Sequence, residues 1–188
     1  MKSLVIVFFL VVSSFCCAQS EEQSFTKNEK SIRRVGDIVQ ISLPFAAGLS
    51  TIILWDKEGA WQFVKSFGTT MAVTYGLKYL INKPRPNGAT DGHAFPSGHT
   101  SAAFSGASFI QKRYGWAYGA PAYAMAGFVA YSRLQGNDPR HDGWDIAAGI
   151  VVGVGSTYLF TTPYQKEHYE LSFSSSRDTY LLGLNYKF

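Results

Sequence analysis

Apolar segments separated by short polar stretches fill most of the chain between Asp37 and Thr162. Five such segments occur, at residues 38–55, 60–81, 97–111, 114–132 and 146–162. Several of them approach the roughly 18 to 20 uncharged residues of a membrane-spanning helix, although Gly, Ser and Thr keep them only moderately apolar. The pattern predicts an all-α fold, a helical bundle of about five core helices, in which Gly149 and Gly153 mark a close helix contact.

The C-terminal tail, residues 164–188, has a different pattern. Apolar residues alternate with others near its end, and a polar turn signal lies at residues 174–178. This alternation predicts a short β-hairpin that packs on the bundle or pairs with a partner. The terminal aromatic residue is typical of outer-membrane barrels, but two strands cannot close a barrel.

The first 18 residues have the three parts of a secretory signal peptide. Lys2 supplies the positive charge, residues 4–12 the apolar core, and residues 16–18 a small-residue cleavage site. An uncleaved anchor helix and a lipoprotein cysteine are the alternatives. Residues 19–34 follow as a polar lead-in, and residues 35–163 form the helical bundle. We therefore expect a protein exported to the cell envelope.

The composition narrows the class of protein. Charged residues make up 16% of the 188 residues, whereas about a quarter is usual in soluble domains. This deficit favours association with a membrane. The net charge of +4 is small and no basic run is interleaved with aromatic residues, which argues against a nucleic-acid partner. A modest positive charge suits an anionic substrate or an anionic lipid surface.

Three polar motifs interrupt the apolar segments, and each falls at a predicted helix end. The first, "LKYLINKPRPNG", places Lys78 about two turns before a helix end imposed by Pro84 and Pro86, with Arg85 between the prolines. Arg and Lys both bind phosphate, Arg through a planar fork of donors and Lys as a point charge. Alone, the motif also fits a solvated helix end.

The second motif, "HAFPSGHTSAAF", contains Ser97, Gly98 and His99. Ser97 is suited to the N-cap of a helix, and Gly98 allows a ligand to approach the backbone closely. The free N–H groups and the positive end of the helix dipole would attract an anion. His93 precedes this motif in the same loop and is expected to be an ordinary loop residue.

The third motif, "SRLQGNDPRHDGWDIAAG", offers Ser132, Arg133, His141 and Asp145. His141 and Asp145 are four residues apart, so on a helix they would share one face. The carboxylate could then accept a hydrogen bond from one imidazole nitrogen and leave the other nitrogen free to attack. An ordinary surface pair at a helix start is the alternative.

Together, the three motifs resemble the signature of the type 2 phosphatidic acid phosphatase family, which shares its fold with vanadium haloperoxidases and bacterial acid phosphatases. The resemblance covers roughly residues 60 to 160. It implies a phosphatase without metal or cofactor, acting on phosphomonoesters or pyrophosphates. His141 would be the nucleophile, Asp145 would orient it, and His99 would be the general acid. The phosphate would be bound by Lys78, Arg85, Ser97, Gly98 and Arg133.

One spacing departs from the family. Seven residues separate Arg133 from His141, where the family usually has five, and the extra length falls in a turn-prone loop. The resemblance implies a phosphohistidine intermediate, and we expect a phosphorylated lipid as substrate, similar to phosphatidic acid or a prenyl pyrophosphate. A broad periplasmic acid phosphatase, a vanadium-dependent haloperoxidase and a non-catalytic envelope scaffold are the alternatives.

The order of the segments also predicts where the motifs lie. If the five segments span a membrane, the three motifs emerge on one face, which is the periplasmic or outer face when the N-terminus is exported. Basic residues do not mark the opposite face clearly, because its short loops contribute mainly Lys57, Lys112 and Arg113. A bundle bound peripherally in the periplasm therefore remains an alternative.

Overall fold

The computed structural model describes residues 27–86, 92–135, 140–164, 169–176 and 179–186. Within these residues the chain forms five helices and one antiparallel β-hairpin, which confirms the predicted fold class. The signal peptide predicted at residues 1–18 lies outside the described residues. The elements are α2 (Lys27–Ile53), α3 (Lys57–Ile81), α4 (Gly98–Tyr114), α5 (Trp116–Leu134), α6 (Gly143–Phe160), β1 (Tyr169–Ser176) and β2 (Thr179–Tyr186).

Helix ends fall where the local sequence predicts them, with one exception. Asp56 caps α3 by accepting a hydrogen bond from Gly59 N, and Asn82 ends this helix in the left-handed conformation just before Pro84. The exception is α2, which begins at Lys27, inside the polar stretch predicted to be a lead-in. Lys, Glu and Arg are good helix formers, so this polar segment extends the first apolar helix toward the N-terminus.

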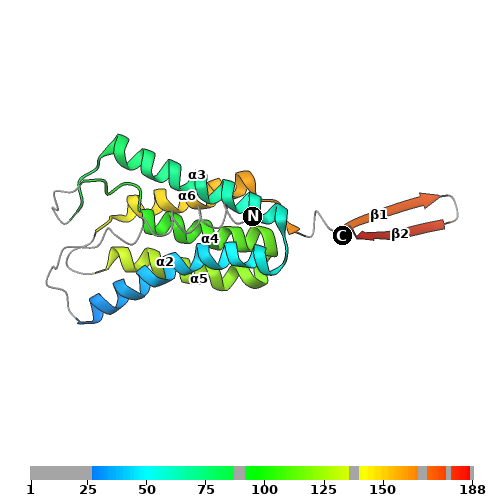
Figure 1. Cartoon of the computed structure of the whole chain (residues 1–188), viewed down its shortest axis with the longest axis horizontal. Helices are drawn as coiled ribbons and strands as arrows, with labels where there is room; N and C mark the ends of the chain where they lie inside the picture. Colours follow the sequence, from blue (N-terminus) through cyan, green and yellow to red (C-terminus); the bar gives the residue numbers. More distant parts are fainter. Residues whose placement is uncertain (1–26, 87–91, 136–139, 165–168, 177–178, 187–188) are drawn as a thin grey trace.

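Helix α4 lies at the centre of the bundle and packs against each of the other four helices (Figure 1). Its contact with α6 depends on the predicted glycine pair. A Cβ atom at Gly149 would lie 2.7 Å from the Ser97 carbonyl oxygen, and one at Gly153 would lie 2.5 Å from that of Ser101. Glycine at these two positions therefore lets the backbones of α4 and α6 approach closely.

Small side chains fill the interior, whereas many large apolar side chains lie on the outside. Buried hydroxyl groups pair between α3 and α4, with Thr74 Oγ1 2.9 Å from Ser101 Oγ. The outer surface carries exposed residues such as Ile52, Trp61, Leu80 and Val151. Helices α2 and α6 are each long and apolar enough to cross a membrane. Small residues inside and large ones outside are typical of helices that pack in lipid.

A buried ion pair joins the helices at the end of the bundle where α2 meets α3. The guanidinium of Arg113 contacts both carboxylate oxygens of Asp56, at 2.6 and 2.7 Å, and donates to Thr162 O at 3.0 Å. The prediction that places Arg113 in a short loop between two helices is wrong, because the residue belongs to α4 and is buried. The ion pair therefore joins the C-terminal end of α4 to Asp56, the N-cap residue of α3.

The hairpin projects away from the helices beyond the C-terminal end of α6 (Figure 1). Phe173 pairs with Leu182 and Ser175 with Tyr180 across the two strands. The side chains of Phe173, Tyr180 and Leu182 are exposed. The predicted hairpin is confirmed, but residues 174–176 of the predicted turn belong to β1. Residues 177–178 lie outside the described residues.

Candidate active site

The three motifs meet at one end of the bundle, as the order of the segments predicts. The C-terminal ends of α3 and α5 and the N-terminal ends of α4 and α6 lie together, on the left in Figure 1, opposite to the hairpin. Helix α2 also has its N-terminal end there. Residues 87–91 and 136–139 lie outside the described residues.

His141 and Asp145 form the first pair of the site. Helix α6 begins after His141, at Gly143, and Asp142 and Asp145 form a capping box at its start. In this box the Asp145 carboxylate accepts a hydrogen bond from the backbone N–H of Asp142. Its Oδ2 then lies 3.5 Å from Nδ1 of His141. Both side chains are buried. At 3.5 Å this is an ion-pair contact rather than a hydrogen bond, and it turns Nδ1 of His141 toward Asp145 and leaves Nε2 as the nitrogen for chemistry.

The electrostatic surroundings keep His141 neutral. Burial is the main cause that lowers the pKa of His141, to about 4. The contact with Asp145 opposes this shift, and the positive charges of Lys78 and Arg85 add to it. Both residues are predicted to bind phosphate, and both act electrostatically on the imidazole. A neutral imidazole beside two cations can attack an electrophile that carries negative charge.

His99 forms a second pair, with an aspartate that the motifs do not include. Nε2 of His99 lies 3.3 Å from Oδ1 of Asp37, and the same oxygen lies 2.9 Å from NH2 of Arg133. Asp37 comes from α2, so the pair exists only because α2 packs against α4 and α5. In the sequence, Asp37 marks only the boundary of an apolar segment. An acidic residue next to such a segment is the one signal that could have drawn attention to it.

Arg133 is held in place from several sides. Its Nε donates to Ser132 Oγ at 3.1 Å, and its NH2 donates to the carbonyl oxygen of Arg33 at 3.1 Å. Gly36 on α2 makes room for it, because a Cβ atom there would overlap Ser132 Oγ and lie 2.8 Å from Arg133 NH2. The guanidinium thus has a fixed position beside His99, which matters for a residue predicted to bind phosphate.

Ser97 and Gly98 begin α4 directly beside α6. Ser97 is the N-cap residue, as predicted, but its side chain makes no capping hydrogen bond and instead accepts one from Thr100 Oγ1 at 3.0 Å. The Ser97 amide donates to the Asp145 carbonyl oxygen at 2.9 Å, which joins the second motif to the third. The stem of Lys78 lies over Gly98, with Cε 3.6 Å from where a Cβ atom would be.

Lys78 also contacts the loop that carries the second motif. Its Nζ donates to the carbonyl oxygen of His93 at 2.7 Å, and Nδ1 of His93 lies 3.0 Å from the carbonyl oxygen of Lys78. His93, expected to be an ordinary loop residue, therefore helps to position a predicted phosphate-binding residue. The sequence alone does not reveal this reciprocal contact, because 15 residues separate the two partners.

Lys83 is a further polar residue of the site, and the motifs do not single it out. Its Nζ lies 2.5 Å from Asp142 Oδ2 and 2.8 Å from Asp145 Oδ1. Lys83 lies within the first motif, between Lys78 and Arg85, but its partners lie at the start of a different helix.

No cluster of three or more His, Cys, Asp or Glu side chains suited to a metal ion occurs among the described residues.

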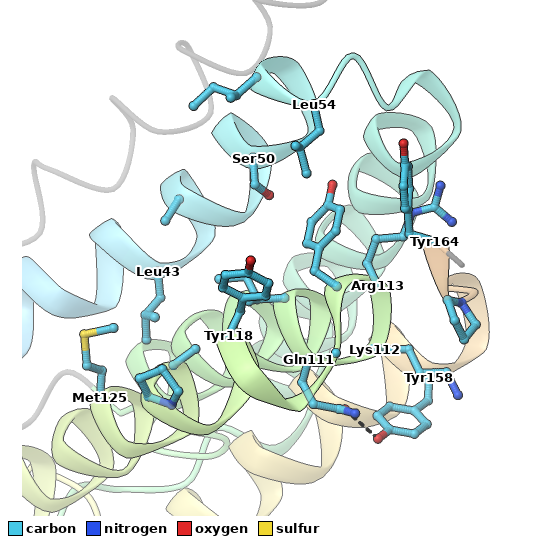
Figure 2. Close-up of a pocket in the computed structure, with 18 residues that line it drawn as sticks. Leu43, Ser50, Leu54, Gln111, Lys112, Arg113, Tyr118, Met125, Tyr158 and Tyr164 are labelled. Atoms are coloured by element: carbon cyan, nitrogen blue, oxygen red, sulfur yellow. Dashed lines mark hydrogen bonds between the residues drawn. The ribbon is translucent and has the colours of Figure 1, made fainter. Parts of the chain in front are cut away.

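A cavity of about 850 Å³ lies between α2, α4 and α5 at the opposite end of the bundle, and none of the predicted site residues lines it. Figure 2 shows its largely apolar wall with Leu43, Tyr118 and Met125, and the hydrogen bond from Tyr158 Oη to Gln111. The chemistry is therefore concentrated at the histidine end, where three cations, a helix start and a buried imidazole could bind and attack a tetrahedral anion.

Comparisons with known proteins agree with this arrangement. The model of the PAP2 superfamily matches residues 59–169. The lipid A 4′-phosphatase of Helicobacter pylori is 29% identical over 171 residues, which cover 83% of this chain and 85% of that protein. The lipid A 1-phosphatase of Porphyromonas gingivalis is 37% identical over 107 residues, which cover 52% of this chain and 23% of that protein.

A solved structure shares the fold. The crystal structure of Aquifex aeolicus LpxE is similar with a TM-score of 0.60 at 18% sequence identity, covering 82% of this chain and 92% of that chain. The superfamily match begins at residue 59, so Asp37 and the rest of α2 lie outside it.

Proposed function

The chain belongs to the PAP2 superfamily, and from this membership we propose that it removes a phosphate group from lipid A at the outer face of a membrane, through a phosphohistidine on His141. The family resemblance of the three motifs is thereby confirmed, and the protein is a hydrolase of phosphate monoesters. The lipid substrate, the residue roles and the periplasmic orientation are the proposed parts.

The first step uses the His141–Asp145 pair. Nε2 of His141 attacks the phosphorus atom, the bond between phosphorus and the lipid oxygen breaks, and a phosphohistidine forms. Asp145 fixes the orientation of the ring through Nδ1 and stabilises the positive charge that develops on it. Lys78, Arg85 and Arg133, with the backbone at Gly98, stabilise the charge on the phosphoryl oxygens.

The second pair of the site, His99 and Asp37, transfers protons. His99 donates a proton to the lipid oxygen as it leaves, and then accepts a proton from the water molecule that attacks the phosphohistidine. This attack releases inorganic phosphate and restores His141. Burial, the largest cause, lowers the pKa of His99, and the charge of Arg133 adds to this shift. Asp37, 3.3 Å from Nε2 of His99, opposes it and stabilises the protonated ring. No step in this scheme requires a metal ion.

The observation that carries the proposal is the convergence of all three motifs at one end of a bundle whose outer surface is apolar. The apolar surface favours a lipid substrate over the soluble esters of an acid phosphatase, since it would bring the site to the level of lipid head groups. The two lipid A phosphatases among the relatives support the same substrate class.

Phosphate release by the purified protein in detergent tests the proposal. The substrates are bisphosphorylated lipid A, a phosphatidic acid, a prenyl pyrophosphate and p-nitrophenyl phosphate, each with EDTA and each beside His141→Gln. We expect EDTA-resistant release from lipid A that His141→Gln abolishes, with mass spectrometry identifying the 1- or the 4′-phosphate as the one removed. Release from the soluble ester alone would exclude the lipid substrate, and no release from any of them would exclude the enzyme assignment.

A further inference from the structure

Lys83 occupies a fixed point in the loop between α3 and α4. It follows Asn82, the C-cap of α3, and its carbonyl oxygen accepts a hydrogen bond from Ala94 N at 2.9 Å. This bond ties the two ends of the loop together. The backbone of Lys83 is therefore held on both sides, and its side chain reaches from there to the start of α6.

The ammonium group completes the hydrogen bonding of Asp145. Oδ2 of Asp145 accepts from Asp142 N at 3.1 Å and faces His141 Nδ1 at 3.5 Å. Oδ1 accepts from Lys83 at 2.8 Å. The Asp145 side chain has no exposed surface, whereas that of Lys83 is 30% exposed. A buried carboxylate oxygen needs a donor, and within the described residues Lys83 is the charged one that reaches it.

We propose that Lys83 is a positioning residue for the nucleophile, holding Asp145 in the orientation that directs Nε2 of His141 toward the phosphate. The inference rests on the proposed function, because it assigns His141 as the nucleophile. Lys83 does not touch the substrate in this proposal. It acts through Asp145, and Asp142 shares the same ammonium group.

The charges around the pair define what Lys83 changes. Asp142 and Asp145 on α6 face it, while Lys78 and Arg85 are the other cations that act on His141. Burial alone would lower the pKa of Lys83, but the hydrogen bonds to Asp142 and Asp145 outweigh it and raise the pKa, so the residue stays charged at neutral pH. Without this cation, the uncompensated carboxylates would favour the protonated, non-nucleophilic form of His141.

Three substitutions at Lys83 separate charge from structure. Lys83→Arg keeps the charge, Lys83→Gln keeps a hydrogen-bond donor without charge, and Lys83→Met removes both. Lys112→Met is the matched control, because Lys112 lies at the other end of α4, with its Nζ over the ring of Tyr158. The readouts are the pH dependence of kcat/KM for lipid A, the melting temperature, and the NMR titration of the His141 imidazole in detergent micelles.

We expect Lys83→Gln and Lys83→Met to lower kcat/KM by about tenfold or more, the size of effect known for residues that orient a functional histidine. The acid limb of the pH profile and the His141 titration should move upward by about one pH unit. Lys83→Arg and Lys112→Met should match the wild type in the pH profile of kcat/KM and in the His141 titration.

An unchanged His141 titration in both uncharged variants, with only a lower melting temperature, would overturn the proposal, as would equal losses in Lys83→Arg and Lys83→Gln. The NMR titration does not depend on turnover. If the wild type releases no phosphate, the proposed function fails while the effect of Lys83 on His141 is still decided.

Discussion

The two histidine–aspartate pairs of the site are built in opposite ways. His141 and Asp145 are four residues apart and are fixed by the capping box of one helix. His99 and Asp37 come from α4 and α2 and meet only through tertiary packing. The side chain of His141 is 5% exposed and that of His99 is 35% exposed. A nucleophile gains from a rigid, closed position, whereas a residue that exchanges protons with water needs access to it.

The largest expected effect distinguishes the two histidines by the leaving group. His141→Gln should reduce turnover of every substrate by roughly a thousandfold or more, because the attacking atom is lost. His99→Gln should reduce turnover of lipid A by roughly a hundredfold to ten-thousandfold, but that of p-nitrophenyl phosphate far less, since nitrophenolate leaves without a proton. Steady-state kinetics with both substrates check this. Equal losses of His99→Gln on the two substrates would contradict the role of His99 as general acid.

The two aspartates should differ in the same sense. Asp145→Asn should lower kcat by roughly a thousandfold or more, because the amide can present the wrong group to Nδ1 and stabilise the wrong tautomer of His141. Asp37→Asn should lower kcat by roughly tenfold to a hundredfold, since Asp37 orients a partly exposed ring and shares its oxygen with Arg133. Measuring kcat at saturating lipid A decides the order. A larger loss in Asp37→Asn would reverse the roles assigned to the two pairs.

A smaller effect tests whether the second pair depends on helix packing. Gly36→Ala would place a methyl group against Ser132 and Arg133, so we expect a loss of about 1–3 kcal/mol of stability and a clear drop in kcat. Gly127→Ala on α5 is the control, because no atom of another element lies within 4 Å of its Cβ position. It should leave activity unchanged and stabilise the helix by up to about 1 kcal/mol. Thermal melts and kinetics measure both, and full activity in Gly36→Ala would separate the second pair from α2 packing.

The response to pH changes stability and leaves the nucleophile in its active form, so we expect the smallest effect on activity. The pKa of His141 is lowered to about 4 in the folded protein, against an ordinary 6.5. Between these values the unfolded state binds a proton that the folded state does not, so stability falls by up to about 3 kcal/mol as the pH drops from 6.5 to 4. The nucleophile itself should stay neutral down to about pH 4. Melting temperatures of the wild type and His141→Gln across this range check the sign: the wild type should lose more.

The same contrast explains how much of the site could be predicted from sequence. The spacing of four residues correctly pairs His141 with Asp145, although His141 lies just before α6 and not on one of its faces. Ser97 is recognisable as a helix start from its residue type and its place after Pro96. The helices were predictable because the apolar segments are long and the breaks carry proline or caps, as at Asn82 and Pro84. These are local signals, and they identify the local part of the site.

The long-range contacts could not be predicted in the same way. Asp37 is an acidic residue at the edge of an apolar segment, and nothing in its neighbourhood names His99 as its partner. Arg113 is a charged residue at the end of an apolar segment, and such residues are usually exposed. In the structure it is buried, because it forms an ion pair with the Asp56 carboxylate. Which residues become partners depends on which helix faces pack together. Many arrangements of five similar apolar helices would bury the same apolar positions, so the sequence pattern does not select one of them.

Contacts between helices, such as the hydrogen bond from Ser97 N to the Asp145 carbonyl oxygen, hold the site together. This has a practical consequence for the long spacer of the third motif. His141 takes its place from α6, and Arg133 takes its place from α2 and its own helix. The connection between them is thus not what sets their geometry, and its two extra residues need not disturb it. An affinity tag or a fluorescent reporter inserted between Gln135 and Arg140 should therefore leave a working enzyme.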